Sequence, residues 1–79
     1  MIKLLSDLAL GEEGTIIAVH GGRGMIQRLR RLGLSKGQRV RKLSALALGG
    51  PVIVMTNRTQ VAIGRGMARK ISVELPVRK

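Results

Sequence analysis

The sequence predicts a small, mainly β domain in which about five short strands form a closed or nearly closed barrel, with one short helix inserted after the first barrel strand. Three observations indicate this class. Short runs rich in Ile, Val and Leu alternate with Gly-rich turns, one segment alone has helical spacing, and 79 residues suffice for one core only. We therefore expect a single domain over residues 1–75, followed by a frayed basic C-terminus at 76–79.

Five segments have the pattern of strands, since each is β-branched or alternates apolar with polar residues and is bounded by turn residues. They are 15–20, 38–46, 52–56, 59–63 and 71–75. In 38–46 the apolar residues Val40, Leu43 and Leu46 do not alternate strictly, which favours a bend. The apolar segment 4–10, ahead of the turn signal at 11–14, is not assigned to a strand.

Two further local patterns connect these strands. Only Asn57 and Arg58 separate 52–56 from 59–63, a spacing that predicts a β-hairpin. Segment 64–70 is too short for a full helix and is predicted to form one helical turn. With no Phe, Tyr or Trp in the chain, the core must consist of Leu, Ile, Val, Met and Ala.

The predicted amphipathic helix spans residues 23–32. Its apolar face consists of Met25, Ile26, Leu29 and Leu32. Gly33 suits the left-handed position that ends a helix, and Leu34 is expected to fold back as the apolar contact behind it.

The glycine run at 21–24 precedes this helix. We interpret it as a tight turn that uses glycine at positive φ. The alternative is a phosphate cradle at the helix start to which Arg23 adds charge.

The charge balance implies an acidic partner. The chain has 15 Lys and Arg against 4 Asp and Glu, a net charge of +11. Such a balance fits nucleic acid, anionic lipid or an acidic protein face, and it also fits a solvated surface. Nucleic acid is the less favoured partner, because Gln27 is the only base-reading candidate on the helix and stacking rings are missing. A dense basic stretch follows the helix start: Arg28, Arg30, Arg31, Lys36, Arg39, Arg41 and Lys42.

Catalysis and strong metal binding are poorly supported by the residues. There is no Cys, and the adjacent acids Glu12 and Glu13 should point apart rather than act as an acid–base pair. His20 is the only histidine and has no ligand at helical spacing, so it is a weak candidate for a metal site, for instance one shared between two chains. We expect no catalytic residue and no cofactor beyond a weakly bound divalent transition metal.

No signal peptide or membrane-spanning run is recognisable, since Asp7 interrupts the N-terminal apolar residues and the longest apolar run is 52–55. We therefore expect a cytoplasmic protein, with a peripheral position at the inner face of the cell membrane as the alternative. The sequence leaves the oligomeric state open, and a homo-oligomer is compatible with it.

Several segments in order resemble the FeoA domain family of ferrous iron uptake. The opening Leu-Ser-Asp-Leu and Gly-Glu-Glu-Gly-Thr-Ile of residues 5–16 resembles the start of these domains. The stretch 28–37, Arg-Leu-Arg-Arg-Leu-Gly-Leu-Ser-Lys-Gly, resembles the family signature R-L-x-x-M-G-L-x-P-G. Leu32 stands for the usual Met, which we interpret as a tolerated core exchange, and Lys36 stands for the usual Pro.

The resemblance implies an SH3-like β-barrel and a non-enzymatic accessory role in ferrous iron uptake. It implies binding to the cytosolic part of a FeoB-type transporter, which promotes or regulates transport, and it implies transition metal ion binding. We expect Arg23, Arg28, Arg30 and Arg31 to bind that partner or an anionic membrane surface, with Arg23 best placed to reach a nucleotide of the transporter. The alternative function is a basic nucleic-acid-binding SH3-like barrel.

Overall fold

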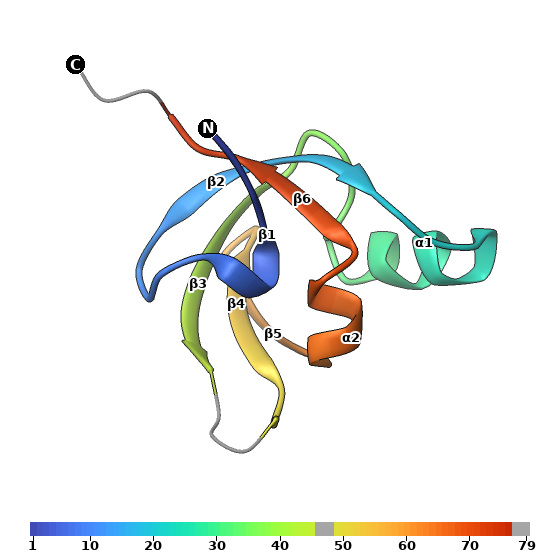
Figure 1. The fold of residues 1–79 in the computed structure, drawn as a ribbon. Helices are drawn as coiled ribbons and strands as arrows, with labels where there is room; N and C mark the ends of the chain where they lie inside the picture. The colour runs from blue at the N-terminus through green and yellow to red at the C-terminus, as the bar shows by residue number, and fades with distance from the viewer. Residues whose placement is uncertain (46–48, 77–79) are drawn as a thin grey trace.

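The computed structural model of the chain describes residues 1–45 and 49–76, and Figure 1 shows its fold. Six antiparallel strands form one sheet in the order β1-β6-β2-β3-β4-β5. The elements in chain order are β1 Ile2–Leu4, the 3₁₀ turn η1 Leu5–Asp7, β2 Glu13–Val19, α1 Arg23–Arg31, β3 Arg39–Ala45, β4 Val52–Thr56, β5 Thr59–Ile63, α2 Arg65–Ala68 and β6 Ile71–Glu74.

The mainly β class and the short amphipathic helix, which is α1, are confirmed, but the described residues contain six strands rather than about five. The strand that the sequence pattern missed is β1. It has three residues, too few to show alternation, and it pairs with β6 at the other end of the chain, Ile2 opposite Glu74. The helix α1 accordingly follows the second strand of the chain rather than the first.

The other predicted elements are confirmed to within two residues at their ends. The bend expected in 38–46 is a register shift between Lys42 and Ser44 against β4, whereas Leu46 lies outside the described residues. In the predicted hairpin, Asn57 and Arg58 have φ of 49° and 62°, which gives a turn whose twist matches that of the flanking strands. Residues 77–79 of the expected frayed end are not described.

The core is aliphatic, as the composition requires. Its members come from every strand but β1 and from both helices, so one apolar cluster joins all layers of the fold. The largest side chains with no exposed surface are Leu5, Ile16, Leu29, Leu34, Val40, Val54, Ile71 and Val73. Met25 and Met67 pack against this cluster from α1 and from α2.

A Schellman motif ends α1 and fixes the helix to the barrel. The Leu34 amide donates to the Leu29 carbonyl at 2.9 Å and the Gly33 amide donates to the Arg30 carbonyl at 3.0 Å, with Gly33 at a φ of 84°. Leu29 and Leu34 are both fully buried, as predicted. Leu32 is 39% exposed, so its assignment to the core face was wrong. It is the C-cap residue, where the backbone has already left the helical conformation.

The glycines before α1 do not use positive φ, which corrects the prediction of a positive-φ turn at 21–24. Gly22 is the N-cap in an extended conformation, with φ of −71°. At Gly21 a Cβ would lie 2.7 Å from the Met25 sulfur, so a larger residue there would displace the end of the flexible Met25 side chain.

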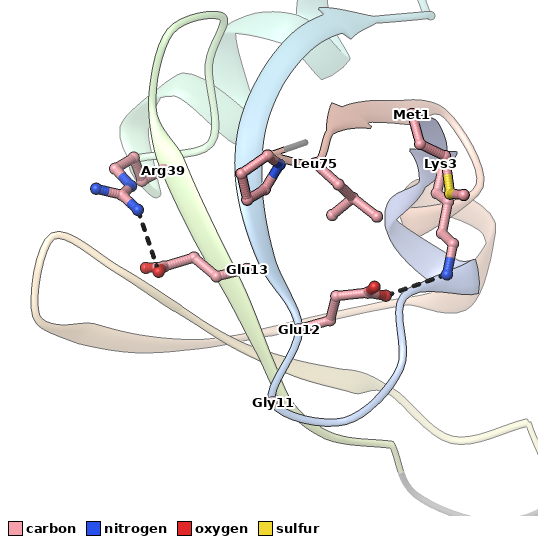
Figure 2. A pocket seen from close by; sticks show the side chains of 8 residues that line it. Met1, Lys3, Gly11, Glu12, Glu13, Arg39 and Leu75 are labelled. Atoms are coloured by element: carbon pink, nitrogen blue, oxygen red, sulfur yellow. Dashed lines mark hydrogen bonds and ion pairs between the residues drawn. The ribbon is translucent and has the colours of Figure 1, made fainter. Parts of the chain in front are cut away.

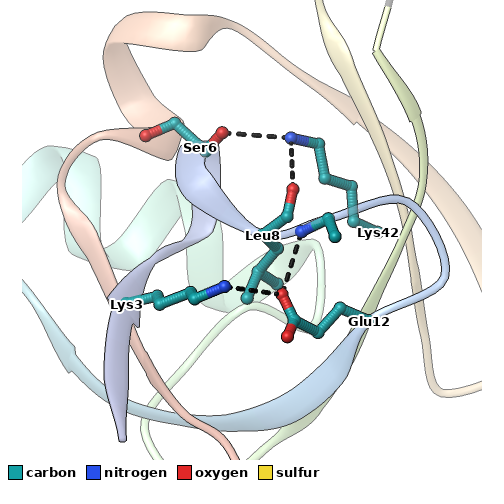
Figure 3. A network of polar contacts seen from close by, with 6 residues as sticks. Lys3, Ser6, Leu8, Glu12 and Lys42 are labelled. Carbon is teal, nitrogen blue, oxygen red and sulfur yellow. Dashed lines mark hydrogen bonds and ion pairs between the residues drawn. The ribbon is translucent and has the colours of Figure 1, made fainter.

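Lys42, assigned by its charge to the surface stretch, lies inside the fold with 7% of its surface exposed. Its ammonium donates to the Leu8 carbonyl at 2.8 Å and to the Ser6 carbonyl at 3.0 Å (Figure 3). The Lys42 amide and carbonyl also bond to Glu12 and Gly11. One residue of β3 therefore holds the whole segment between η1 and β2, a role that depends on contacts distant in sequence.

Gly14 marks a close approach of β2 and β6. A Cβ at this position would lie 2.5 Å from the Glu74 carbonyl oxygen and 2.6 Å from Val73 Cγ1. Because a carbonyl oxygen cannot move without breaking the ladder of β6, only glycine fits here.

We expect Lys42→Met to lower the free energy of unfolding by about 1–3 kcal/mol, because the apolar stem is kept while buried carbonyls lose their donor. Urea unfolding followed by far-UV circular dichroism measures the change. Lys36→Met is the matched control, since it removes the same charge from an exposed position. Equal stability of the two variants would contradict the structural role of the Lys42 ammonium.

We expect Gly14→Ala to lower the free energy of unfolding by about 1–3 kcal/mol or more, because the added methyl group overpacks against β6. Gly24→Ala is its control, since a Cβ there meets nothing within 4 Å, and alanine within a helix should be neutral or slightly stabilising. The same unfolding measurement checks both. A Gly14→Ala protein as stable as the wild type would show that β2 and β6 can separate without loss.

Candidate functional site

The main candidate site is the basic surface of α1. Arg23, Arg28, Arg30 and Arg31, here called the α1 arginines, are all exposed. The other side of the helix faces the barrel, since Leu29 is buried there and Met25 and Ile26 are partly buried. The periodicity of the sequence thus placed these four side chains correctly on the outer surface, and the structure brings them onto one short helix.

The α1 arginines have no acidic neighbour of their own. Within residues 1–45 and 49–76 none of the four makes an ion pair or a side-chain hydrogen bond. Two of the four acids pair with other cations, Glu12 with Lys3 and Glu13 with Arg39, each at 3.2 Å. The helix therefore presents uncompensated positive charge to whatever approaches it.

The position of these charges along α1 is uneven. Arg28, Arg30 and Arg31 lie in the last turn, where cations complement the negative end of the helix dipole. Arg23 lies in the first turn, where the same dipole disfavours a cation and where no acid compensates it. Local helix stability does not explain Arg23, so its charge is a candidate for contact with a partner.

An open hollow of about 610 Å³ lies where the end of α1 meets the β4–β5 hairpin. We call it the basic hollow; its lining includes Arg30, Arg31, Leu32, Asn57, Gln60 and Ala62. The Thr56 hydroxyl donates to the Gly33 carbonyl at 3.0 Å and fixes the two elements to each other. The hollow takes in Arg30 and Arg31, whereas Arg23 and Arg28 are not part of its lining.

Sequence reasoning missed the hairpin side of this hollow. Asn57, Gln60 and Ala62 carry no charge, and the hairpin pattern to which they belong indicates structure rather than binding. Only the contact between Gly33 and Thr56 places them beside the arginines.

A second hollow is lined in part by Met1, Leu75 and Pro76, and Figure 2 shows its lining. Leu75 forms an apolar wall, and the ion pairs Lys3–Glu12 and Glu13–Arg39 lie on either side of it. The side chains of Glu12 and Glu13 point to different partners, as predicted for adjacent acids. Because both carboxylates are paired with cations, this hollow lacks an acid–base couple.

His20 is exposed just beyond the end of β2, and its Nε2 lies 3.1 Å from the Ser72 hydroxyl. In the part of the chain that the structure describes, no three His, Cys, Asp or Glu side chains gather as metal ligands. A tight metal site needs three or four such ligands, so the donor set does not fit a resident metal. The weak candidate at His20 stays a prediction.

No helix among the described residues is long and apolar enough to cross a bilayer.

Comparison with known proteins identifies the fold and its family. A model of the FeoA domain family matches residues 3–75. A candidate Fe(2+) transport protein A of Methanocaldococcus jannaschii is 39% identical over 64 residues, covering 81% of this chain and 76% of that protein.

Solved structures agree. A crystal structure of an iron uptake regulatory protein (FeoA) matches with a TM-score of 0.86 and 30% identity, covering 92% of this chain and 96% of its own. Zinc-complexed FeoA of Stenotrophomonas maltophilia, described as a prokaryotic SH3 domain protein and a candidate activating factor of ferrous iron transport, matches with a TM-score of 0.74 and 29% identity. It covers 94% of this chain and 89% of its own.

These matches confirm the SH3-like fold and the resemblance of the sequence motifs. Because the family model spans nearly the whole described chain and the archaeal relative shares 39% of the aligned residues, the protein belongs to the FeoA family of non-enzymatic ferrous iron transport proteins.

Proposed function

We propose that this protein is an accessory factor that binds the cytosolic part of a FeoB-type ferrous iron transporter through the α1 arginines and thereby regulates transport. The observation that carries the proposal is the set of four exposed arginines on one helix without an acidic partner in the described chain. Positive charge of this kind accelerates encounter with an acidic surface and sets the orientation of binding.

Family membership supports the transporter as the partner, and the description of the Stenotrophomonas maltophilia relative as a candidate transport activating factor supports a regulatory effect. In this proposal the protein regulates transport by the position that the bound domain takes on the transporter. The helix is fixed to a stiff barrel by Leu29 and Leu34, so binding at the arginines positions the whole domain on the transporter. Iron is the cargo of the transporter in this proposal.

We expect the double variant Arg28→Glu, Arg31→Glu to abolish capture by the isolated cytosolic domain of the same organism's FeoB-type transporter, because attraction becomes repulsion. Arg69→Glu with Lys70→Glu is the matched control. These residues are also exposed near a helix C-terminus and change the net charge equally, but they directly follow α2 and are called the α2 variant. The control should bind like the wild type.

Circular dichroism must show that both double variants are folded. Arg28→Gln with Arg31→Gln is a milder variant that removes both charges without placing acids at the C-terminal end of α1, where the helix dipole disfavours them. Affinity should fall as salt rises. Equal capture of the α1 and α2 variants would contradict the α1 arginines as the binding site.

The nucleic-acid alternative rests on the net charge of +11. It is tested by the salt dependence of binding to unrelated duplexes, since many phosphate contacts give a steep slope. We expect weak binding that the α1 and α2 variants reduce equally, because charge alone drives it. A tight complex that depends on α1 would favour the nucleic-acid function instead.

A further inference from the structure

Strand β5 forms one edge of the six-stranded sheet, and its sole sheet neighbour among the described strands is β4. The other edge is β1, which begins beside the N-terminus (Figure 1). An edge strand carries one row of backbone N–H and C=O groups that the sheet does not use.

The register identifies the free groups of β5. Thr56 lies opposite Thr59 across the two-residue turn Asn57-Arg58, so this pair exchanges backbone hydrogen bonds. Hydrogen-bonded pairs alternate along an antiparallel ladder. Val61 therefore bonds to β4, whereas the N–H and C=O groups of Gln60 and Ala62 point away from the sheet. Both residues are exposed.

This edge lacks the features that keep edge strands from pairing. Its sequence, Thr-Gln-Val-Ala-Ile, has no charge and no proline, and its register against β4 is continuous over five pairs. The opposite edge is blunted, because β1 has only three residues and includes the charged Lys3. The contrast marks β5 as the edge that is open to a further strand.

The basic hollow lies at this same edge. Gln60 and Ala62 share its lining with Arg30 and Arg31. Leu32, 39% exposed at the end of α1, adds an apolar surface. A segment that paired with β5 would therefore have guanidinium groups beside its side chains, and carboxylates are the groups they bind best.

We propose that β5 and the basic hollow receive an extended acidic segment of a partner protein, which adds to the sheet as a seventh strand. Its backbone bonds to the N–H and C=O groups of Gln60 and Ala62, and its carboxylates bind Arg30 and Arg31. The inference takes from the proposed function only the acidic character of the partner. A second copy of this chain does not fit, because each copy carries a net charge of +11 and brings its own arginines.

The probe is a fluorescein-labelled octapeptide of alternating Glu and Val, and fluorescence anisotropy measures its binding to the full chain at low and moderate salt. Two control peptides isolate the two components of recognition. Lys in place of Glu reverses the charge, and methylation of alternate backbone amides removes hydrogen bonds at unchanged charge. We expect both to bind about tenfold more weakly or worse.

Two variants test the protein side. Ala62→Pro removes an outward N–H without breaking the ladder to β4 and should weaken binding about tenfold. Gln38→Ala, the control, shortens a polar side chain outside β5 and outside the basic hollow, so its affinity should equal that of the wild type. Amide hydrogen exchange gives an independent readout, since exchange at Gln60 and Ala62 should slow when the peptide binds and exchange at Arg58 should not.

Equal binding of the methylated peptide, or full affinity of a folded Ala62→Pro protein, would overturn strand addition. Dimerisation that Ala62→Pro abolishes would assign the edge to a second copy instead. The transporter experiment is separate. If the peptide binds β5 but the transporter is not captured, only the proposed function fails; if the transporter is captured but the peptide does not bind, only the β5 site fails.

Discussion

Strand β6 lies between β1 and β2, so the end of the chain closes the sheet against its beginning. The contact buries Ile71 and Val73 completely, and it is close enough that Gly14 admits no side chain. Pairing β6 with β1 closes a loop that contains nearly the whole chain. Closing this loop costs conformational entropy, which burial of aliphatic surface must offset. With no aromatic residue in the core, the barrel depends on this close packing of Leu, Ile and Val.

The helix α1 depends on the barrel in turn. Leu29 and Leu34 bury its inner side, and the Schellman motif uses hydrogen bonds of the chain itself to end it. A nine-residue helix is marginal in isolation, so packing is what keeps the arginines in a fixed array. The structure thus combines a stiff apolar anchor with an uncompensated charged surface, which suits a domain that acts by binding rather than by catalysis.

The basic residues are divided between two tasks. Lys42 is a structural cation that holds the segment from Ser6 to Glu12, whereas Lys3 and Arg39 neutralise the acids near the chain termini. The α1 arginines make no ion pair among the described residues, and they are the ones that we propose bind a partner. The net charge therefore overstates the charge that is available to bind a partner. The proposed site contains fewer basic residues than the basic stretch of the sequence, because Lys42 is buried and Arg39 is paired with Glu13. Its neighbour is the uncharged edge of β5, where recognition of a backbone can add to recognition of charge.

The sequence by itself determined the local elements, because strand alternation, the Asn57-Arg58 turn, the helical face of Leu29 and the Gly33 cap depend on neighbouring residues only. It also determined the family and the outward direction of the α1 arginines. Only the tertiary structure decided the pairing of β1 with β6, the burial of Lys42, the exposure of Leu32 and the union of α1 with β5 around the basic hollow. Each of these depends on contacts between residues far apart in the chain, which leave no periodic pattern.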